Sequence, residues 1–137
     1  MTLDEALARY PGAATFRPGD SAELNAEILF LVRSGRKTMT CDAWSAFGTD
    51  EPLPEPGRID IALDWSGRPA YAVETLRVEK IRFCDMTEDR IPAQGEFRDL
   101  PHWQEGYRAY LDRAGRFSPD IPMMVETFRL VEDFADV

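Results

Sequence analysis

The segment from Gly35 to Thr40 reads Gly-Arg-Lys-Thr-Met-Thr and places a lysine beside two threonine hydroxyls. A lysine can grip a phosphate through its ammonium group, or accept a proton once burial or a second cation lowers its pKa. Arg33 and Arg36 lie close enough in sequence to Lys37 to supply that cation. The competing interpretation is a helix-end lysine that interacts favourably with the negative end of the helix dipole.

Strand geometry decides whether Lys37 and Thr40 can act together. In a regular strand that begins near Lys37, Thr38 and Thr40 share one face, while Lys37 and Met39 share the other. A bend or bulge at the start of the strand would bring Lys37 and Thr40 onto one side. The alternative role for Thr40 is that of a β-branched residue filling a strand position.

Other nucleophiles and metal ligands are few. Cys41 and Cys84 belong to no CxxC motif, so we expect two reduced, buried thiols rather than a zinc set or a disulfide framework. His102 is the single histidine and lies far from Cys41 in sequence. One histidine excludes a multi-histidine metal site, and no carboxylate spacing indicates a cation site. Neither a metal nor another cofactor is therefore expected.

Three tryptophans are candidates for stacking on a nucleobase, which contributes on the order of 1–3 kcal/mol per base. Trp44 follows the Lys-Thr segment directly and is the best candidate. Trp65 lies at the tip of an expected hairpin and should be exposed, whereas Trp103 lies on the apolar face of a helix and should be buried.

The charge of the chain restricts its partners. The sequence has 16 basic and 25 acidic residues, for a formal net charge of −9. Polyanions are bound mainly through Lys and Arg contacts to phosphates, so this balance disfavours duplex DNA. Single-stranded RNA, or more readily one nucleoside or nucleotide, can bind where basic residues converge on a cleft. Arg77, Lys80 and Arg82 are candidates to join Arg36 and Lys37 there, although scattered solvated charges are the commoner arrangement.

Hydrophobic periodicity and turn residues predict the elements that would hold these side chains. Asp20 or Ser21 is expected to cap the second helix. Glu74 and Glu126 are either inward-facing acids of the cleft or residues on the solvent-facing sides of their strands, and the solvent-facing placement is preferred. Short strands between loops rich in Pro and Gly indicate an α+β domain with a small barrel. Helices are expected over residues 2–10, 22–33 and 101–111, and strands over 37–44, 58–63, 70–83 and 123–131.

No apolar run approaches the ~20 residues of a membrane span. The first residues, Met-Thr-Leu-Asp-Glu-Ala, carry acids where a signal peptide has a basic stretch. A cytoplasmic protein without a membrane partner is therefore expected, and the sequence carries no signal for an oligomeric state.

Several motifs occur in an order that resembles the ASCH family. A helix ends in the Gly35–Thr40 segment, the loop 51–57 is rich in proline, a hairpin occupies 64–69, and Met124 to Phe128 looks like the closing strand. The resemblance covers residues 16–132 and implies a small PUA-like β-barrel with flanking helices. Residues 1–15 would then be an N-terminal helical extension and residues 133–137 an acidic tail.

The resemblance also implies a function, because ASCH proteins are thought to bind RNA. It implies that RNA, a nucleotide or a modified nucleoside binds in a cleft beside the Gly35–Thr40 segment, with ligand-binding residues Arg36, Lys37, Thr38, Trp44 and Arg77. Some members are reported to cleave single-stranded RNA or to remove an acyl group from a modified cytidine. The alternatives are therefore a hydrolase, either an N4-acylcytidine amidohydrolase or a single-strand ribonuclease, and an interaction domain without activity.

In the deacylating relatives a matching Lys and Thr are proposed as base and nucleophile, which carries over to Lys37 and Thr40. Their third residue, a glutamate after the long strand, aligns here with Gln94. A glutamine cannot act as a carboxylate base or form an ion pair with a lysine. Glu96, two residues later, is the candidate for this place in a shifted loop, so the implied catalytic residues are Lys37, Thr40 and Glu96.

Overall fold

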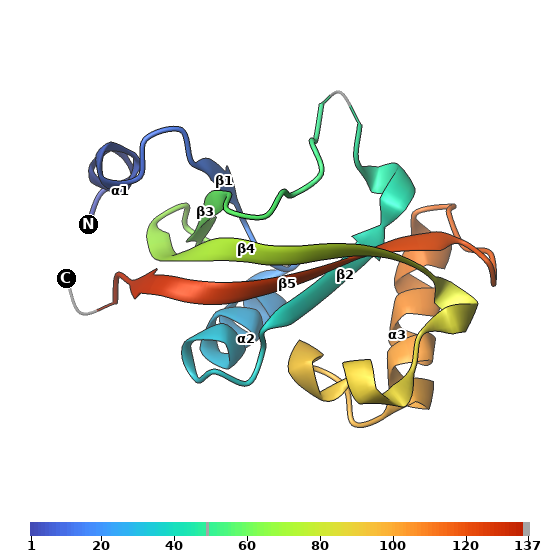
Figure 1. Ribbon diagram of the computed structural model, residues 1–137. Coiled ribbons are helices and arrows are strands. Elements are labelled where there is room, and N and C mark those ends of the chain that lie inside the picture. The colour runs from blue at the N-terminus through green and yellow to red at the C-terminus, as the bar shows by residue number, and fades with distance from the viewer. Residues whose placement is uncertain (49, 136–137) are drawn as a thin grey trace.

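A five-stranded sheet and three α-helices form the part of the chain that the computed structural model describes, residues 1–48 and 50–135 (Figure 1). The helices are α1 (Leu3–Arg9), α2 (Ala22–Arg33) and α3 (Leu100–Arg113). The strands are β1 (Ala14–Phe16), β2 (Met39–Ala43), β3 (Ile59–Leu63), β4 (Pro69–Arg82) and β5 (Pro122–Asp133). Short 3-10 helices lie in the connections: η1 (Trp44–Ala46), η2 (Phe83–Asp85), η3 (Glu88–Arg90) and η4 (Pro92–Gln94).

Helix α2 leads into the Lys-Thr segment, and local chemistry fixes both of its ends. The Ser21 hydroxyl accepts a hydrogen bond from the backbone N–H of Leu24, so Ser21 rather than Asp20 is the cap. After the helix, Gly35 adopts a left-handed conformation with φ 79°, which turns the chain toward β2. The sequence predicted both ends of this helix.

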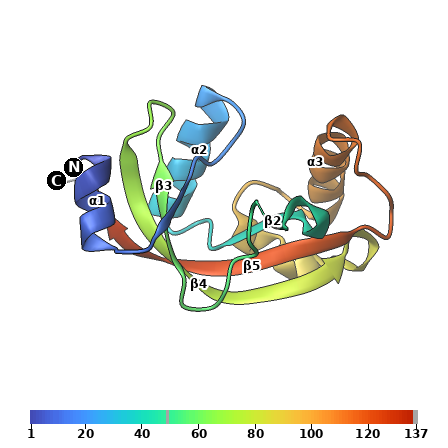
Figure 2. The same cartoon turned by 90° about the horizontal axis from the view of Figure 1, so that it is seen from above.

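The long antiparallel pair β4–β5 forms the centre of the sheet. Its register shifts twice, at Ala72/Val73 and at Thr75/Arg77. Such shifts leave an extra residue in one strand and bend it. Figure 2 shows the two strands curving together, with α2 and α3 standing on the same side of them. The curved face between these two helices is where the site described below lies.

The barrel expected from the sequence is not closed among the residues that the structure describes. The strand order β1-β3-β4-β5-β2 leaves β1 and β2 as the two edges, and each pairs on one side only. Helix α2, which joins these edge strands in sequence, packs Leu29 and Val32 against Tyr71, Val73 and Phe128 of the sheet. A helix thus buries the apolar face that closure would otherwise cover, and the fold is α+β with an open mixed sheet.

Two other core clusters hold the ends of the sheet. Trp103 and Leu111 of α3 are both 0% exposed and pack near η2, η4 and β5, which confirms the prediction for Trp103. At the far end, Ala6 of α1 is buried in a cluster with Phe134. Phe134 is 4% exposed and Asp133 ends β5, so this part of the expected tail is packed; residues 136–137 lie outside the described part.

The sequence missed β1, because residues 12–19 read as a connector rich in turn residues. β1 is three residues long and pairs in parallel with β3, so it is too short to show strand periodicity. Within the described ranges, no helix combines the length and the apolar composition that a membrane crossing requires.

Candidate functional site

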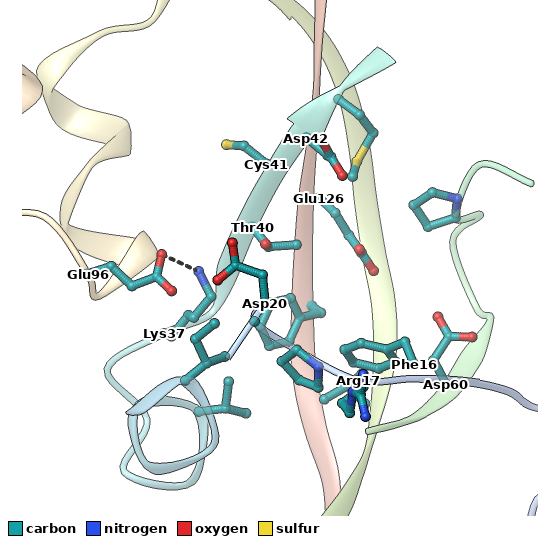
Figure 3. Close-up of a pocket in the computed structure, with 18 of the residues that line it drawn as sticks. Phe16, Arg17, Asp20, Lys37, Thr40, Cys41, Asp42, Asp60, Glu96 and Glu126 are labelled. Carbon is teal, nitrogen blue, oxygen red and sulfur yellow. Dashed lines mark ion pairs between the residues drawn. The ribbon is translucent and has the colours of Figure 1, made fainter. Parts of the chain in front are cut away.

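A pocket of about 720 Å³ opens between α2, α3 and the curved sheet. Its walls bring together Lys37, Thr40 and Glu96 from three separate parts of the chain (Figure 3). Its volume falls in the range of pockets that hold a small organic ligand. Seven acidic and four basic side chains line it, so the pocket is not a basic cleft.

Lys37 is the most deeply buried charged residue of the pocket wall, at 4% exposed. Its Nζ donates hydrogen bonds to the carbonyl oxygens of Met39, at 2.9 Å, and Gln94, at 3.1 Å. A carboxylate oxygen of Glu96 lies 3.7 Å from the same nitrogen. Burial lowers the pKa of Lys37, and the Glu96 carboxylate opposes this effect. Through these hydrogen bonds Lys37 connects the turn before β2 to the loop around η4. Its side chain also lines the pocket.

The turn before β2 explains why Lys37 and Thr40 share the pocket. The backbone N–H groups of Arg36 and Lys37 both donate to the carbonyl oxygen of Leu31, and β2 begins only at Met39. Lys37 thus belongs to the turn after α2, outside the strand whose alternation would separate it from Thr40. The bend at the start of the strand, which was one of the two possibilities considered from the sequence, is therefore present.

Gln94 is a core residue rather than a site residue. Its side chain is 0% exposed, and its Oε1 accepts hydrogen bonds from Trp103 Nε1 at 2.8 Å and from the Cys41 thiol at 3.5 Å. A buried amide that is satisfied in this way has no oxygen to offer to a ligand.

Glu96 occupies the place beside Lys37 that Gln94 cannot fill, as the shifted-loop interpretation expected. The intervening Gly95 has φ 74°, and a Cβ there would lie 2.9 Å from the carbonyl oxygen of Arg36. Only glycine combines this left-handed turn with so close an approach to the backbone. Gly95 therefore lets the loop deliver Glu96 to the lysine.

A second polar group lies on the sheet at the floor of the pocket. Glu126 of β5 accepts a hydrogen bond from the Thr75 hydroxyl at 2.7 Å. Burial raises the pKa of Glu126; the nearby Asp60 carboxylate adds to this, while the Thr75 hydroxyl and Arg58 act against it. Asp60 is 6% exposed, and its Oδ2 accepts hydrogen bonds from Arg58 at 2.8 and 3.0 Å.

The sequence-based preference for a solvent-facing Glu126 was wrong, and the alternative of an inward-facing acid is the one that the structure supports. Along β5 the side chain alternates in phase with Met124 and Phe128, and all three line the pocket. An acid in phase with two large apolar residues was the available signal. Glu74, by contrast, faces outward as expected and pairs with Arg129 at 2.6 Å.

Four of the predicted ligand-binding residues lie outside the pocket: Arg36, Thr38, Trp44 and Arg77. Arg36 and Thr38 are exposed on the turn before β2. β2 ends at Ala43 and η1 begins at Trp44, so the alternation that would place Trp44 on the side of Thr40 stops there. The Trp44 ring instead lies 4.7 Å from the Lys80 ammonium.

Arg77 and its neighbours do not form the expected basic patch. The Arg77 side chain is 63% exposed and pairs with Glu79 at 3.3 Å. Arg82 pairs with Asp85 at 2.8 Å, and Arg33 pairs with Asp133 at 3.1 Å. Arg77 shares Glu79 with Arg90, and the other two arginines pair with different carboxylates, which corresponds to the scattered, solvated arrangement.

Several aromatic residues line the pocket, and among them is Phe16 of β1, which the sequence did not single out because β1 was missed. It lines the pocket and is 39% exposed. Trp65 is 38% exposed, as predicted, and the Arg17 guanidinium lies 3.9 Å from the centre of its ring.

The two thiols differ in their surroundings. Cys41 is buried, and burial raises its pKa to about 12, so it is not a thiolate nucleophile at neutral pH. Cys84 is exposed on η2, which corrects the expectation of two buried thiols. Within the described residues, no group of three or more His, Cys, Asp or Glu side chains is arranged to hold a metal ion.

Known proteins share this fold. A family model described as ASCH domain matches residues 14–132. The ASCH domain from Lactobacillus crispatus JV V101 has a TM-score of 0.81 at 23% identity, over 93% of this chain and 85% of that chain. A protein from Enterococcus faecalis V583 has a TM-score of 0.81 at 26% identity, over 96% and 91%. A hypothetical protein has a TM-score of 0.62 at 14% identity, over 87% and 99%. No curated protein matches this chain.

Proposed function

Because this chain belongs to the ASCH domain family, we propose that it binds a single nucleoside or nucleotide in the pocket beside Lys37. The observation that carries the proposal is the meeting of Lys37, Glu96 and Thr40 at the wall of one pocket of about 720 Å³. A few convergent charged and hydroxyl groups in the wall of a concave pocket are typical of sites for polar small molecules.

The charge of the pocket favours a nucleoside over a long RNA. Acidic side chains outnumber basic ones along its walls, and Lys37 and Arg58 already contact Glu96 and Asp60. A chain of phosphates needs several cations without such partners. A nucleoside offers hydroxyls and base edges, which carboxylates and threonine can bind without a phosphate contact.

Isothermal titration calorimetry with four plain nucleosides, N4-acetylcytidine and a short single-stranded RNA tests the proposal. We expect binding of at least one nucleoside, weakened about tenfold or more by Thr40→Val, which removes a hydroxyl from the pocket at nearly constant volume. Arg77→Ala is the matched control, since this side chain lies outside the pocket. Binding of none of the nucleosides would overturn the proposal, and equal loss with Arg77→Ala would place the site elsewhere.

A hydrolase is the second candidate, favoured by the Lys37–Glu96 pair. In an amidohydrolase, Thr40 Oγ1 would attack the acyl carbon of an N4-acylcytidine while a neutral Lys37 amine takes the hydroxyl proton. The C–N bond then breaks, the cytidine amino group leaves with that proton, and water hydrolyses the ester to release the acid. Burial lowers the pKa of Lys37 and so favours the neutral amine, whereas the Glu96 carboxylate favours the charged form.

The resting arrangement favours binding over catalysis, because Nζ of Lys37 donates to the carbonyl oxygens of Met39 and Gln94. Chromatography of N4-acetylcytidine incubated with the protein separates the two functions. Cytidine released by the wild type and by Thr40→Ser, but not by Thr40→Val, would establish a hydrolase. Binding without product would leave the protein a nucleoside-binding module.

A further inference from the structure

The sheet at the floor of the pocket carries two carboxyl groups that make no ion pair with Lys37. Glu126 and Asp60 come from strands β5 and β3, and both line the pocket (Figure 3). Asp60 Oδ2 is held by Arg58, whereas Asp60 Oδ1 is buried without a hydrogen-bond partner among the described residues. A buried acceptor without a donor is rare in folded proteins and calls for a partner.

We propose that Glu126 and Asp60 form a base-reading subsite that selects a nucleobase carrying an exocyclic amino group, with Phe16 against the ring. This inference rests on the proposed nucleoside binding. An amino group brings two N–H donors, which are what acceptor oxygens at the floor require. Phe16 is an exposed aromatic on β1, the strand paired with β3, and can stack on a base whose edge faces the carboxyls.

Cytosine and uracil are the pair of bases that this floor distinguishes. Cytosine carries an amino group at position 4, where uracil carries a carbonyl oxygen. A carboxyl keeps at least one acceptor oxygen in either protonation state, so it can accept from the amino group. The uracil oxygen would instead face the acceptor oxygens of Glu126 and Asp60, and a site built around a hydrogen bond rejects an analogue that cannot make it.

Thr75 fixes the orientation of the Glu126 carboxyl. Its hydroxyl donates to Oε2 of Glu126 at 2.7 Å, which leaves Oε1 as the other oxygen of this group. In Glu126→Gln the amide oxygen is expected to keep the Thr75 hydrogen bond, so the amide nitrogen takes the place of Oε1. An acceptor then becomes a donor without a change of shape, and the preference between cytosine and uracil should shift toward uracil.

The position of Glu126 also fits the amidohydrolase alternative. Thr40 and Glu126 are direct partners in the β2–β5 register, so both side chains leave the same face of the sheet. An amino group bound at Glu126 would bring an acyl substituent on that nitrogen toward the Thr40 hydroxyl.

Calorimetry with cytidine and uridine tests the subsite. We expect wild type to bind cytidine more tightly than uridine, and Glu126→Gln to reduce that ratio by about tenfold or to reverse it. Asp60→Asn should reduce it in the same direction. Glu74→Gln is the matched control, because Glu74 lies on the neighbouring strand outside the pocket and pairs with Arg129. Thermal melts show which variants are folded at the temperature of the titration.

The outcomes separate this inference from the proposed function. If nucleosides bind and Thr40→Val weakens them, but Glu126→Gln and Asp60→Asn leave the cytidine-to-uridine ratio unchanged, only the subsite is wrong. A shift of the same size in Glu74→Gln also overturns the subsite, because that residue cannot reach the ligand. If the wild type binds no nucleoside, both the subsite and the proposed function fail.

Discussion

Thr40 on β2 and Glu126 on β5 are directly paired across the antiparallel strands, and both side chains line the same pocket. Thr40 belongs to the segment on which the sequence placed the chemistry, whereas Glu126 comes from the far end of the chain. The pair therefore connects the side of the pocket that carries Lys37 and Glu96 to the side that carries Glu126 and Asp60. Substitutions at these two residues therefore separate the functions of the two sides.

We predict that Lys37→Ala lowers stability as well as function. The substitution removes two hydrogen bonds to backbone carbonyls and leaves Glu96 without its cation. A loss of about 2–4 kcal/mol in the free energy of unfolding is expected. Urea denaturation measures it. Arg36→Ala, the exposed neighbour, should cost less than about 0.5 kcal/mol; similar values for the two variants would contradict the structural role of Lys37.

A second prediction concerns the pH dependence of stability at Glu126. Its pKa is raised in the folded state, first by burial and then by Asp60, above its ordinary value of 4.5. The folded protein then binds the proton more tightly than the unfolded chain. The contribution of Glu126 to the stability of the fold is therefore complete below that ordinary value and is lost as the pH rises through the folded pKa.

Glu126→Gln removes this titration while keeping an acceptor for the Thr75 hydroxyl. The variant should therefore melt higher than wild type at pH 8, with the advantage shrinking as the pH falls toward 4. Melting curves across this range measure the difference, and an advantage that is constant with pH would show that the Glu126 carboxyl does not titrate differently on folding.

A third prediction concerns Phe16 and Trp44. Phe16→Ala should weaken nucleoside binding about tenfold, because loss of one stacking contact costs on the order of 1–3 kcal/mol. Trp44→Ala should leave affinity unchanged, since Trp44 does not line the pocket. Titration of both variants with cytidine measures the contrast. The reverse result would restore the stacking role that the sequence assigned to Trp44.

A fourth prediction uses the thiols as a probe of the fold. A thiol reagent such as Ellman's should modify one cysteine rapidly in the folded protein, because Cys84 is exposed and Cys41 is buried with its pKa raised to about 12. Cys84→Ser should remove the rapid phase, and urea should expose the second thiol. Two rapid thiols in the native wild-type protein would contradict the burial of Cys41.

The sequence by itself determined the local elements and one wall of the site. Helix α2 and the strands β2, β3 and β5 followed from caps and alternation, whereas the hypothesis that Lys37, Thr40 and Glu96 act as one group came from the resemblance to the ASCH family. The helix and the strands depend on residues close in sequence, whose conformations the chain fixes locally. For the same reason Trp103 could be assigned to the core.

Only the tertiary structure decided which side chains meet. The sheet remains open because α2 covers its curved face, and no local pattern states how strands far apart in sequence close or fail to close. Glu126 and Asp60 reach the pocket through strand register, and Trp44 leaves it because β2 ends one residue earlier. Since side chains alternate along a strand, a single residue of register or strand length moves a group into the site or out of it.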